Sequence, residues 1–439
     1  MKKLIEGNCL FKIIPPDGHA TGRPPVVQLR NSLTLDDGNF YQYPTLILGS
    51  AGSGKSTLMR QLAKPIFEHA KRNNDNVITF CAKSDMLEFA SPDDIIINIS
   101  NTKNTNACWN IFEEMKASSD PELTLREIST ALFEDAEEKS SQPFFPQAAR
   151  EIFFKTALYM HKYAISKKIS LSNDDLIEFL ETTPIHGSDS DPGWVELASL
   201  YPDSFGMLRD YLGDGSDQGL GCLSEIRTML SKTFFGSFKS YGGTFSAIRS
   251  SQSGGKKIFL DYNYSSGGHT TLPVYKILVD LLLREAMRTD AKHKTWFLLD
   301  EGALLPKSNV LTDALSFGRD PSSGNKNAGV RILMALQSAR QMTNHYTQAE
   351  AECLLSLFPN IIAMRIADSF SRKIVSDRYG KAHYLYTYSG VGGKEHIHEA
   401  TEAVVSDYHF SYITKEGQAI MSLPAFSSHP FIYDGYRKE

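Results

Sequence analysis

The chain has 439 residues, more than one hydrophobic core usually organises, so we expect two domains or one domain with a large insertion. Apolar residues make up 41% and charged residues 22%, as in an ordinary soluble globular protein. The 46 basic and 51 acidic side chains give a net charge of −5, which excludes a uniformly basic coat for nucleic acid but not a local basic stripe.

The cysteines and the apolar runs exclude further classes of protein. The five cysteines are odd in number and never form a C-x-x-C pair, so we expect reduced thiols and neither a disulfide framework nor a zinc site. No window approaches the roughly eighteen consecutive apolar residues of a membrane helix, and no apolar signal core follows the charged start Met1-Lys2-Lys3. We therefore expect a cytoplasmic chain without a membrane segment, which would reach the inner face of the cell membrane only through partners.

The chain begins with a segment that leads into a phosphate-binding loop. Residues 1–43 contain two turn signals around short strand-like runs, which predicts a small β-rich region. The apolar run 45–48 then predicts a strand. After residue 56, Leu58, Leu62 and Ile66 recur at helical spacing and predict a helix. A strand before the loop and a helix after it are the context that a phosphate loop requires.

Residues 49–56 form the most specific motif in the sequence. Their order, Gly-Ser-Ala-Gly-Ser-Gly-Lys-Ser, matches the phosphate-loop pattern G-x-x-x-x-G-K-[ST] at every fixed position. The glycines let backbone N–H groups turn toward phosphate oxygens, and the helix N-terminus adds partial positive charge. Lys55 is placed to reach the β- and γ-phosphates, and the Ser56 hydroxyl to ligate Mg²⁺. We therefore predict binding of ATP with Mg²⁺ through Gly49, Ser50, Ala51, Gly52, Ser53, Gly54, Lys55, Ser56 and Thr57.

The pattern becomes helical in the middle of the chain. Two short apolar runs after the phosphate-loop helix predict strands that are buried on both faces. Residues 147–166 then have the apolar spacing of a long amphipathic helix, and no strand-like run interrupts the helical pattern up to residue 235. We predict an all-helical insertion domain at 117–235, between the two parts of a nucleotide-binding motor domain at 1–116 and 236–439.

Strands and helices alternate again after the insertion. Apolar runs at 257–262, 295–299, 330–336 and 361–366 predict strands, with helical segments between them. Outside the insertion, this alternation predicts an α/β protein with a doubly wound sheet. Open sheets of this kind bind ligands beyond the carboxyl ends of their strands.

Two carboxylates follow the predicted strand at 295–299. The run Phe297-Leu298-Leu299-Asp300-Glu301 has the form of a Walker B strand, which places Asp300 where Mg²⁺ would sit. Glu301 could polarise an attacking water as a general base. The alternative, for this pattern alone, is a strand end with two solvated acids.

Gln337 ends the next predicted strand and would lie beside Asp300 at the same edge of the sheet. Its amide could hold the attacking water or sense the γ-phosphate, as a glutamine does in other P-loop enzymes. The alternative is a surface glutamine on a loop. We include Gln337 with Lys55 and Glu301 among the predicted catalytic residues.

Two further patterns near the C-terminus are weaker. His396-Ile397-His398 puts two imidazoles on one side of an extended segment, but no third ligand is evident nearby, which favours exposed polar alternation over a metal site. Tyr384, Tyr386 and Tyr388 alternate and could stack on bases. A tyrosine-rich strand face that packs on the sheet is the favoured interpretation, because aromatic residues favour strands.

With these motifs placed, the chain resembles the type IV coupling proteins, the conjugation and secretion ATPases of the FtsK/HerA translocase superfamily. The likeness covers nearly the whole chain from about residue 43 onward. Besides the phosphate loop, it depends on Cys108-Trp109-Asn110-Ile111-Phe112, Leu299-Asp300-Glu301, Gly318-Arg319, Gly329-Val330-Arg331, Leu336-Gln337-Ser338 and residues 358–380.

The resemblance implies a recA-like motor domain with a membrane-distal all-α domain, assembled as a hexameric ring around a channel. It implies ATP hydrolysis that moves DNA, expected to be single-stranded, or a DNA–protein substrate towards a type IV secretion channel. The implied partners are secretion-channel or relaxosome proteins. Arg319 would act as a finger on the ATP of a neighbouring subunit, and Arg331 is the next candidate for that role.

Family members usually begin with transmembrane helices, whereas nothing before the phosphate loop in this sequence could span a bilayer. We therefore expect either a trimmed chain or a membrane-free relative. Two other functions stay open at this point. One is a recruitment platform, in which the helical insertion binds partner proteins and ATP sets its state. The other is a HerA-like motor for DNA processing or defence.

Overall fold

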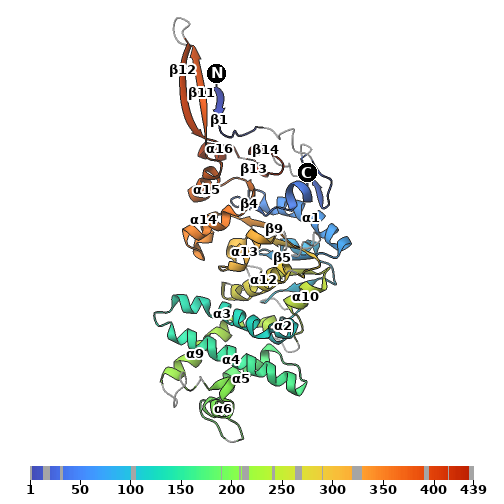
Figure 1. The fold of residues 1–439 in the computed structure, drawn as a ribbon, viewed down its shortest axis with the longest axis vertical. Helices are drawn as coiled ribbons and strands as arrows, with labels where there is room; N and C mark the ends of the chain where they lie inside the picture. The colour runs from blue at the N-terminus through green and yellow to red at the C-terminus, as the bar shows by residue number, and fades with distance from the viewer. Residues whose placement is uncertain are drawn as a thin grey trace. The chain divides into compact units, whose positions relative to one another are not determined.

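The structure, a computed structural model, consists of two compact units (Figure 1). The first unit contains Met1–Ser91 and Ala286–Glu439, and the second contains Pro92–Glu285. The second unit includes the predicted insertion at 117–235, whose own boundaries stay a prediction. The structure describes residues 2–12, 20–29, 33–99, 105–188, 190–206, 209, 217–239, 243–262, 269–288, 290–318, 329–389, 395–413 and 415–434.

A mostly parallel sheet organises the first unit. Among the described residues of this unit, its strands lie in the order β14 (Phe431–Tyr433), β13 (Ala419–Ser422), β10 (Asn360–Ala363), β4 (Thr45–Leu48), β9 (Gly329–Leu336), β8 (Lys294–Leu299) and β5 (Asn76–Cys81). Strands β10, β4, β9, β8 and β5 are parallel to one another. Strand β13 is antiparallel to β10, and β14 is antiparallel to β13. The predicted α/β class is confirmed, with strands close to the predicted positions.

The central strands are mostly apolar and are buried along their whole length. Every residue of β4, β5, β9 and β10 is buried. Continuous apolar runs of this kind are expected in parallel strands that are covered on both faces. Helix α1 (Lys55–Asn73) packs against β4 and β5 and buries Leu58, Leu62 and Ile66, as its spacing predicts. The other helices of this unit are α13 (Asn309–Phe317), α14 (Gln348–Ser356), α15 (Ser369–Tyr379) and α16 (Asp407–Tyr412).

The second unit is mainly helical. In its described residues from 117 to 235 there are helices and no strand. Its core includes Phe133 and Phe153, whose ring centroids lie 5.9 Å apart. Two strands of this unit, β6 (Ile95–Ile97) and β7 (Lys257–Asp261), pair in parallel. Its helices are α2 (Ile111–Ala117), α3 (Pro121–Lys139), α4 (Phe144–Lys167), α5 (Asn173–Thr182), α6 (Trp194–Leu200), α7 (Pro202–Phe205), α9 (Asp217–Thr233), α10 (Ala247–Ser253) and most of α12 (Leu272–Met287).

The two ends of the helical segment meet within the second unit. The N–H of Phe245 donates to the carbonyl oxygen of Cys108, and the N–H of Asn110 donates to that of Phe245, both at 3.1 Å. The fully buried carboxylate of Glu114, in α2, accepts four hydrogen bonds around this point. Its donors are Trp109 Nε1 at 2.8 Å, Ser246 Oγ at 2.7 Å, Ala247 N at 2.5 Å and Ile248 N at 3.1 Å.

A separate small sheet joins the N-terminal strand of the chain to a hairpin formed by residues 381–403. Strands β11 (Lys381–Ser389) and β12 (Glu395–Ala403) form an antiparallel hairpin, and β1 (Lys2–Glu6) pairs with β11 (Figure 1). The predicted β-rich start of the chain is thus confirmed by β1 and by the pair β2 (Val26–Gln28) and β3 (Thr34–Asp36).

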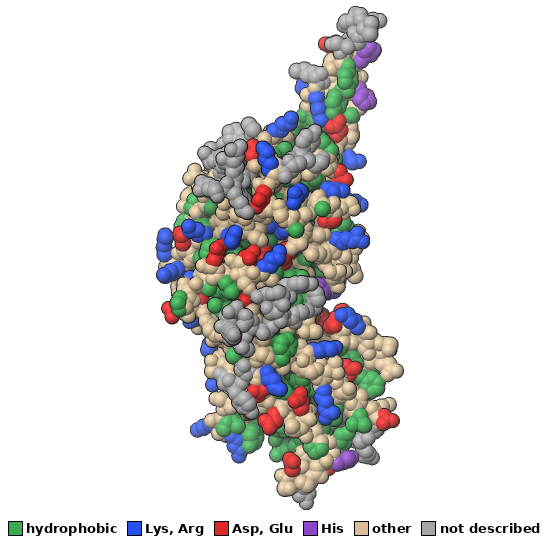
Figure 2. All heavy atoms as spheres, turned by 180° about the vertical axis from the view of Figure 1, so that it is seen from behind, with side chains coloured by type: hydrophobic (Ala, Val, Ile, Leu, Met, Phe, Trp, Pro, Cys, Tyr) green, Lys and Arg blue, Asp and Glu red, His purple; other side chains and the backbone are tan. Residues whose placement is uncertain are grey.

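The expectation that the tyrosine-rich face packs on the central sheet is wrong. Strand β11 belongs to the small sheet, and Tyr388 is 53% exposed. In the hairpin, Tyr386 lies opposite His398 and Tyr388 opposite His396, so the two patterns share one exposed face. Figure 2 shows histidine and hydrophobic side chains together along this hairpin. Side-chain alternation predicts a strand but does not indicate which sheet the strand joins.

In the described part of the chain, none of the helices combines the length with the apolar character needed to cross a bilayer.

Candidate nucleotide-binding site

Three neighbouring strands bring the predicted site residues to one edge of the sheet. Strand β9 lies between β4 and β8, and all three are parallel. Leu48, at the end of β4, is level with Leu336, at the end of β9, and β8 ends two positions earlier along β9. The phosphate loop, Gln337 and Asp300 directly follow these strands, so they emerge together at the carboxyl ends.

The phosphate loop has a backbone that depends on its glycines. Gly52 and Gly54 have φ angles of +69° and +98°, which residues with a side chain rarely adopt. A Cβ atom on Gly49 would lie 2.7 Å from Ser53 Oγ and 2.8 Å from Met364 Cβ, closer than real contacts allow. The loop can therefore curve tightly at the end of β4 only because these positions are glycine.

Helix α1 begins where the loop ends. Its first residue is Lys55 and its N-cap is Gly54, whose carbonyl oxygen accepts from the N–H of Leu58 at 3.0 Å. Ser56 and Thr57 are half-buried in the first turn. Because N–H groups in a first helical turn have no carbonyl partner in the helix, this end of α1 can donate to an anion held by the loop.

The side chain of Lys55 is enclosed by the site. It is 7% exposed, and its Nζ donates to the carbonyl oxygen of Ser50 at 3.4 Å. Burial lowers the pKa of Lys55, and the nearby carboxylates of Glu301 and Asp300 act in the opposite direction. An ammonium group in this position faces both the loop and the acidic pair, as required of a group that binds the phosphates of a metal-bound nucleotide.

Asp300 has the properties of a cation ligand. It is 4% exposed, and burial raises its pKa to about 6, with Glu301 and Asp85 acting in the same direction. Two nearby lysines act against this rise. Carboxylate and hydroxyl oxygens are the ligands that Mg²⁺ prefers, and a divalent cation would favour the charged form of the buried acid. The donor set of Asp300 and Ser56 thus fits Mg²⁺.

Glu301 differs from Asp300 in its backbone. It has φ +60° and ψ +50°, in the left-handed region, and is 7% exposed. A residue other than glycine in this region costs about 1–3 kcal/mol, and such strain clusters at functional sites. The turn after it packs closely on β9, since a Cβ atom on Gly302 would lie 2.7 Å from Met334 Cε. Glu301 is therefore held firmly next to Asp300 in an unusual conformation.

The structure thus brings the phosphate loop, Asp300, Glu301 and the half-buried Gln337 to one edge. Arg319 lies outside the described residues, and its role stays a prediction. Arg331 is not placed to act as a finger. It is 8% exposed in β9, near the end of the strand that lies away from Gln337, and its Nε is 3.6 Å from Asp37 Oδ1.

Sequence reasoning missed charged residues that follow two other strands. Lys83 and Asp85 follow β5 and contribute to the charge around Asp300. Arg365 follows β10, and its Nη2 donates to the carbonyl oxygen of Ala51 in the phosphate loop at 3.1 Å. The signal that could have identified them is position, because each comes within four residues of the carboxyl end of an apolar strand.

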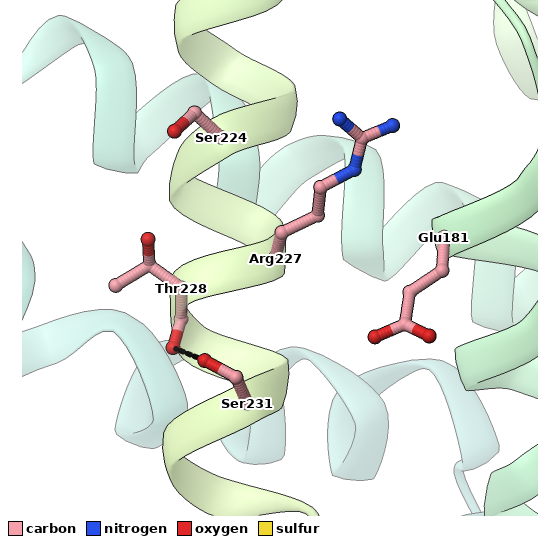
Figure 3. Close-up of a pocket in the computed structure, with 5 residues that line it drawn as sticks. All are labelled: Glu181, Ser224, Arg227, Thr228 and Ser231. Atoms are coloured by element: carbon pink, nitrogen blue, oxygen red, sulfur yellow. Dashed lines mark hydrogen bonds between the residues drawn. The ribbon is translucent and has the colours of Figure 1, made fainter.

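A cavity in the second unit has no comparable set of groups. Its volume is about 470 Å³, and Glu181 projects into it from α5 toward α9 (Figure 3). The lining residues, all exposed, are Glu181, Ser224, Arg227, Thr228 and Ser231. Among the described residues there is also no group of three or more His, Cys, Asp or Glu side chains suited to a metal ion.

The sheet, the phosphate loop and the acidic pair define a protein with the P-loop NTPase fold and an inserted all-α domain. More specifically, the chain belongs to the family described as the type IV secretion-system coupling protein DNA-binding domain, whose model matches residues 39–187 and 216–415. No curated protein matches the chain.

Solved structures of coupling proteins share the fold. The bacterial conjugative coupling protein TrwBdeltaN70, in its unbound monoclinic form, has a TM-score of 0.74 at 19% identity, over 100% of this chain and 95% of that one. TrwB in complex with ADP and Mg²⁺ has a TM-score of 0.72 at 20% identity, over 99% and 95%. VirB4 of Thermoanaerobacter pseudethanolicus is more distant, with a TM-score of 0.52 at 12% identity, over 96% and 98%.

Proposed function

We propose that the chain is an ATPase that moves DNA, or a DNA–protein substrate, towards a type IV secretion channel. The main observation behind this proposal is the convergence of the phosphate loop, Asp300, Glu301 and Gln337 at the carboxyl ends of β4, β8 and β9. The family supports DNA as the substrate, because its description names a DNA-binding domain.

In this mechanism, residues of the chain bind the nucleotide, orient the attacking water and remove a proton from it. Loop N–H groups and Lys55 bind the phosphate oxygens. Ser56 and Asp300 would hold Mg²⁺, which would supply positive charge against the negative charge on those oxygens. Glu301 accepts a proton from the attacking water at a carboxylate oxygen, and the Gln337 amide orients that water. The description of TrwB in complex with ADP and Mg²⁺, and with a non-hydrolysable ATP analogue, supports ATP and Mg²⁺ as the ligands here.

The proposal includes an assembly. We infer a hexameric ring in which Arg319 of one subunit acts on the ATP of the next, with DNA, in particular single-stranded DNA, in the central channel. Relaxosome or secretion-channel proteins would supply the cargo and receive it. The family and its fold support these inferences.

The decisive test is ATPase activity with and without DNA, measured together with particle mass. We expect hydrolysis to be stimulated by single-stranded DNA, and more weakly by double-stranded DNA, in a particle of about six chains. Lys55→Ala removes the charge that faces the β- and γ-phosphates, so this variant should stay folded and lose hydrolysis. A folded Lys55→Ala variant with unchanged activity would refute the site, and a wild-type chain that is indifferent to every DNA would refute the DNA motor.

A recruitment platform is the second candidate, and the surface of the helical segment favours it. Large hydrophobic side chains are exposed there, although that segment also has its own core. They are Leu123, Phe144, Tyr163, Ile165, Ile169, Leu200, Tyr201 and Leu220. If the chain is a recruitment platform, it should bind ATP but its hydrolysis should not be stimulated by DNA. The same experiment therefore distinguishes the platform from the DNA motor. A HerA-like DNA-processing motor would instead be revealed by a nuclease among the co-purifying proteins.

A further inference from the structure

We propose that Arg365 is a positioning residue that holds the tip of the phosphate loop in the conformation that binds the nucleotide. The inference rests on the proposed function, because it concerns the same site. Arg365 lies outside the Walker motifs, and it follows β10, the strand that pairs with β4 directly before the loop.

The side chain of Arg365 contacts the loop at its tip. Its Nη2 donates to the carbonyl oxygen of Ala51 at 3.1 Å. The same Nη2 lies 3.5 Å from the place that a Cβ atom on Gly52 would take. The guanidinium group is therefore packed against the Ala51–Gly52 peptide, which is the most exposed part of the loop.

This contact sets the direction of a backbone donor. In a planar trans peptide, the C=O and the next N–H point in opposite directions. Because the carbonyl oxygen of Ala51 is directed to Arg365, the N–H of Gly52 is directed away from it. Among the described residues, this N–H donates to no other group. The φ of +69° at Gly52 permits the arrangement, which leaves the N–H available to a phosphate oxygen.

The main chain around Arg365 fixes the base of the loop in the same way. The N–H of Ser50 donates to the carbonyl oxygen of Arg365 at 2.7 Å, and the Ser50 hydroxyl accepts from the N–H of Ala367 at 2.9 Å. Ser50 is thus held by the segment after β10, and its N–H is not available to a ligand. Among the described residues that follow β10, the side chain of Arg365 extends this support to the tip.

A plain surface arginine that satisfies one carbonyl group would have almost no effect on nucleotide binding. A positioning residue predicts a specific kinetic effect instead. Loss of a ground-state contact raises KM and the dissociation constant while kcat stays unchanged, because the transition state and the ground state lose the same binding. One hydrogen bond from a charged donor corresponds to roughly a tenfold change in affinity.

The experiment compares Arg365→Gln, Arg365→Lys and Lys373→Gln in the full chain. Lys373→Gln is the matched control, because it removes an exposed cation from α15, the helix that follows the same segment. Binding of a fluorescent ATP analogue and steady-state hydrolysis are measured, with circular dichroism as the check of folding. We expect Arg365→Gln to weaken binding and raise KM roughly tenfold at unchanged kcat. Arg365→Lys should recover most of the loss, and the control should behave as the wild type.

Three outcomes overturn the inference. They are wild-type binding by Arg365→Gln, an equal loss in Lys373→Gln, and a fall in kcat at unchanged KM. If Arg365→Gln does not fold, Arg365→Lys is compared with Arg365→Met, which has no donor. The inference is then supported if Arg365→Lys keeps its affinity and KM while Arg365→Met shows the loss, and it is overturned if Arg365→Met shows no loss. A wild-type chain that binds no nucleotide refutes the proposed function itself, and is recognised by a titration in which Lys55→Ala makes no difference.

Discussion

Asp300 and Glu301 are neighbours in the chain, but their surroundings give them different chemistry. Asp300 continues the direction of β8, and its N–H donates to the carbonyl oxygen of Phe80 in β5 at 3.0 Å. Its burial and raised pKa suit a group that is charged when a cation is present. Glu301, one residue later, is displaced from the strand by its left-handed backbone. This difference supports Asp300 as the metal ligand and Glu301 as the general base.

The first prediction concerns this division of roles. Glu301→Gln keeps the size of the side chain but removes the base, so ATP should still bind while turnover falls by roughly 10²- to 10⁴-fold. Asp300→Asn should instead weaken binding of the Mg²⁺ complex of ATP. Nucleotide titration and phosphate release measure the two effects. If Glu301→Gln lost ATP binding while Asp300→Asn hydrolysed ATP normally, the two roles would be reversed.

At the scale of elements, Glu114 joins the two ends of the helical segment. It lies in α2, and three of its four donors lie at the start of α10, more than 130 positions later in the sequence. Burial raises the pKa of Glu114 despite these donors. Removal of this enclosed carboxylate would leave several buried donors without an acceptor, which is energetically costly.

The second prediction is therefore a loss of stability in Glu114→Ala. We expect the free energy of unfolding to fall by about 3 kcal/mol, because buried N–H and O–H groups lose their acceptor. Chemical denaturation of the full chain measures it. Glu122→Gln is the control, since Glu122 is 55% exposed and its pair with Arg126, at 3.7 Å, contributes little. Equal stability of the two variants would show that the Glu114 hydrogen bonds do not stabilise the contact between α2 and the start of α10.

The third prediction concerns the helical segment as a whole. Because Asn110 and Phe245 are hydrogen-bonded, a short glycine–serine linker can replace residues 111–242. This variant should keep ATP binding, because all the site residues lie in the first unit. It should lose stimulation by DNA or binding of partners. If variants with several linkers all failed to fold, the segment would be part of the motor core.

For the whole molecule, the proposed ring requires that one subunit supplies an arginine to the γ-phosphate bound by the next. Arg331 is buried beside Asp37, which leaves Arg319 as the predicted finger. A finger supplied by a neighbour stabilises charge that develops in the transition state and is worth about 10³- to 10⁵-fold in rate. An arginine with only a surface ion pair would contribute little.

The fourth prediction tests whether sites are shared between subunits. Arg319→Ala should bind ATP normally and hydrolyse it far more slowly. A mixture of Arg319→Ala and Lys55→Ala chains should recover part of the activity, because some interfaces then pair an intact loop with an intact finger. Phosphate release by the mixture, with mixed particles shown by mass, is the measurement. An inactive mixture in which mixed rings do form would exclude a finger in trans, and full turnover by Arg319→Ala would exclude Arg319.

Features that depend on residues close together in the chain could be predicted from the amino-acid sequence alone. The loop at 49–56, the strand before Asp300 and the helix that starts at Lys55 all follow from local spacing, because apolar periodicity and glycine content act over a few residues. The same local reasoning placed Gln337 at a strand end, which the structure shows to be the end of β9.

The choice of neighbouring strands, in contrast, could be read from the folded structure and not from local sequence patterns. The position of β9 between β4 and β8, the small sheet that holds Tyr388, and the contact from Arg365 to Ala51 all join segments far apart in the sequence. Such pairings depend on the packing of whole elements. The apolar pattern of a strand shows which of its faces are buried, but it does not identify the strand that lies beside it. The chemistry of each strand end was therefore readable from the sequence, whereas the assembly of those ends into one site required the fold.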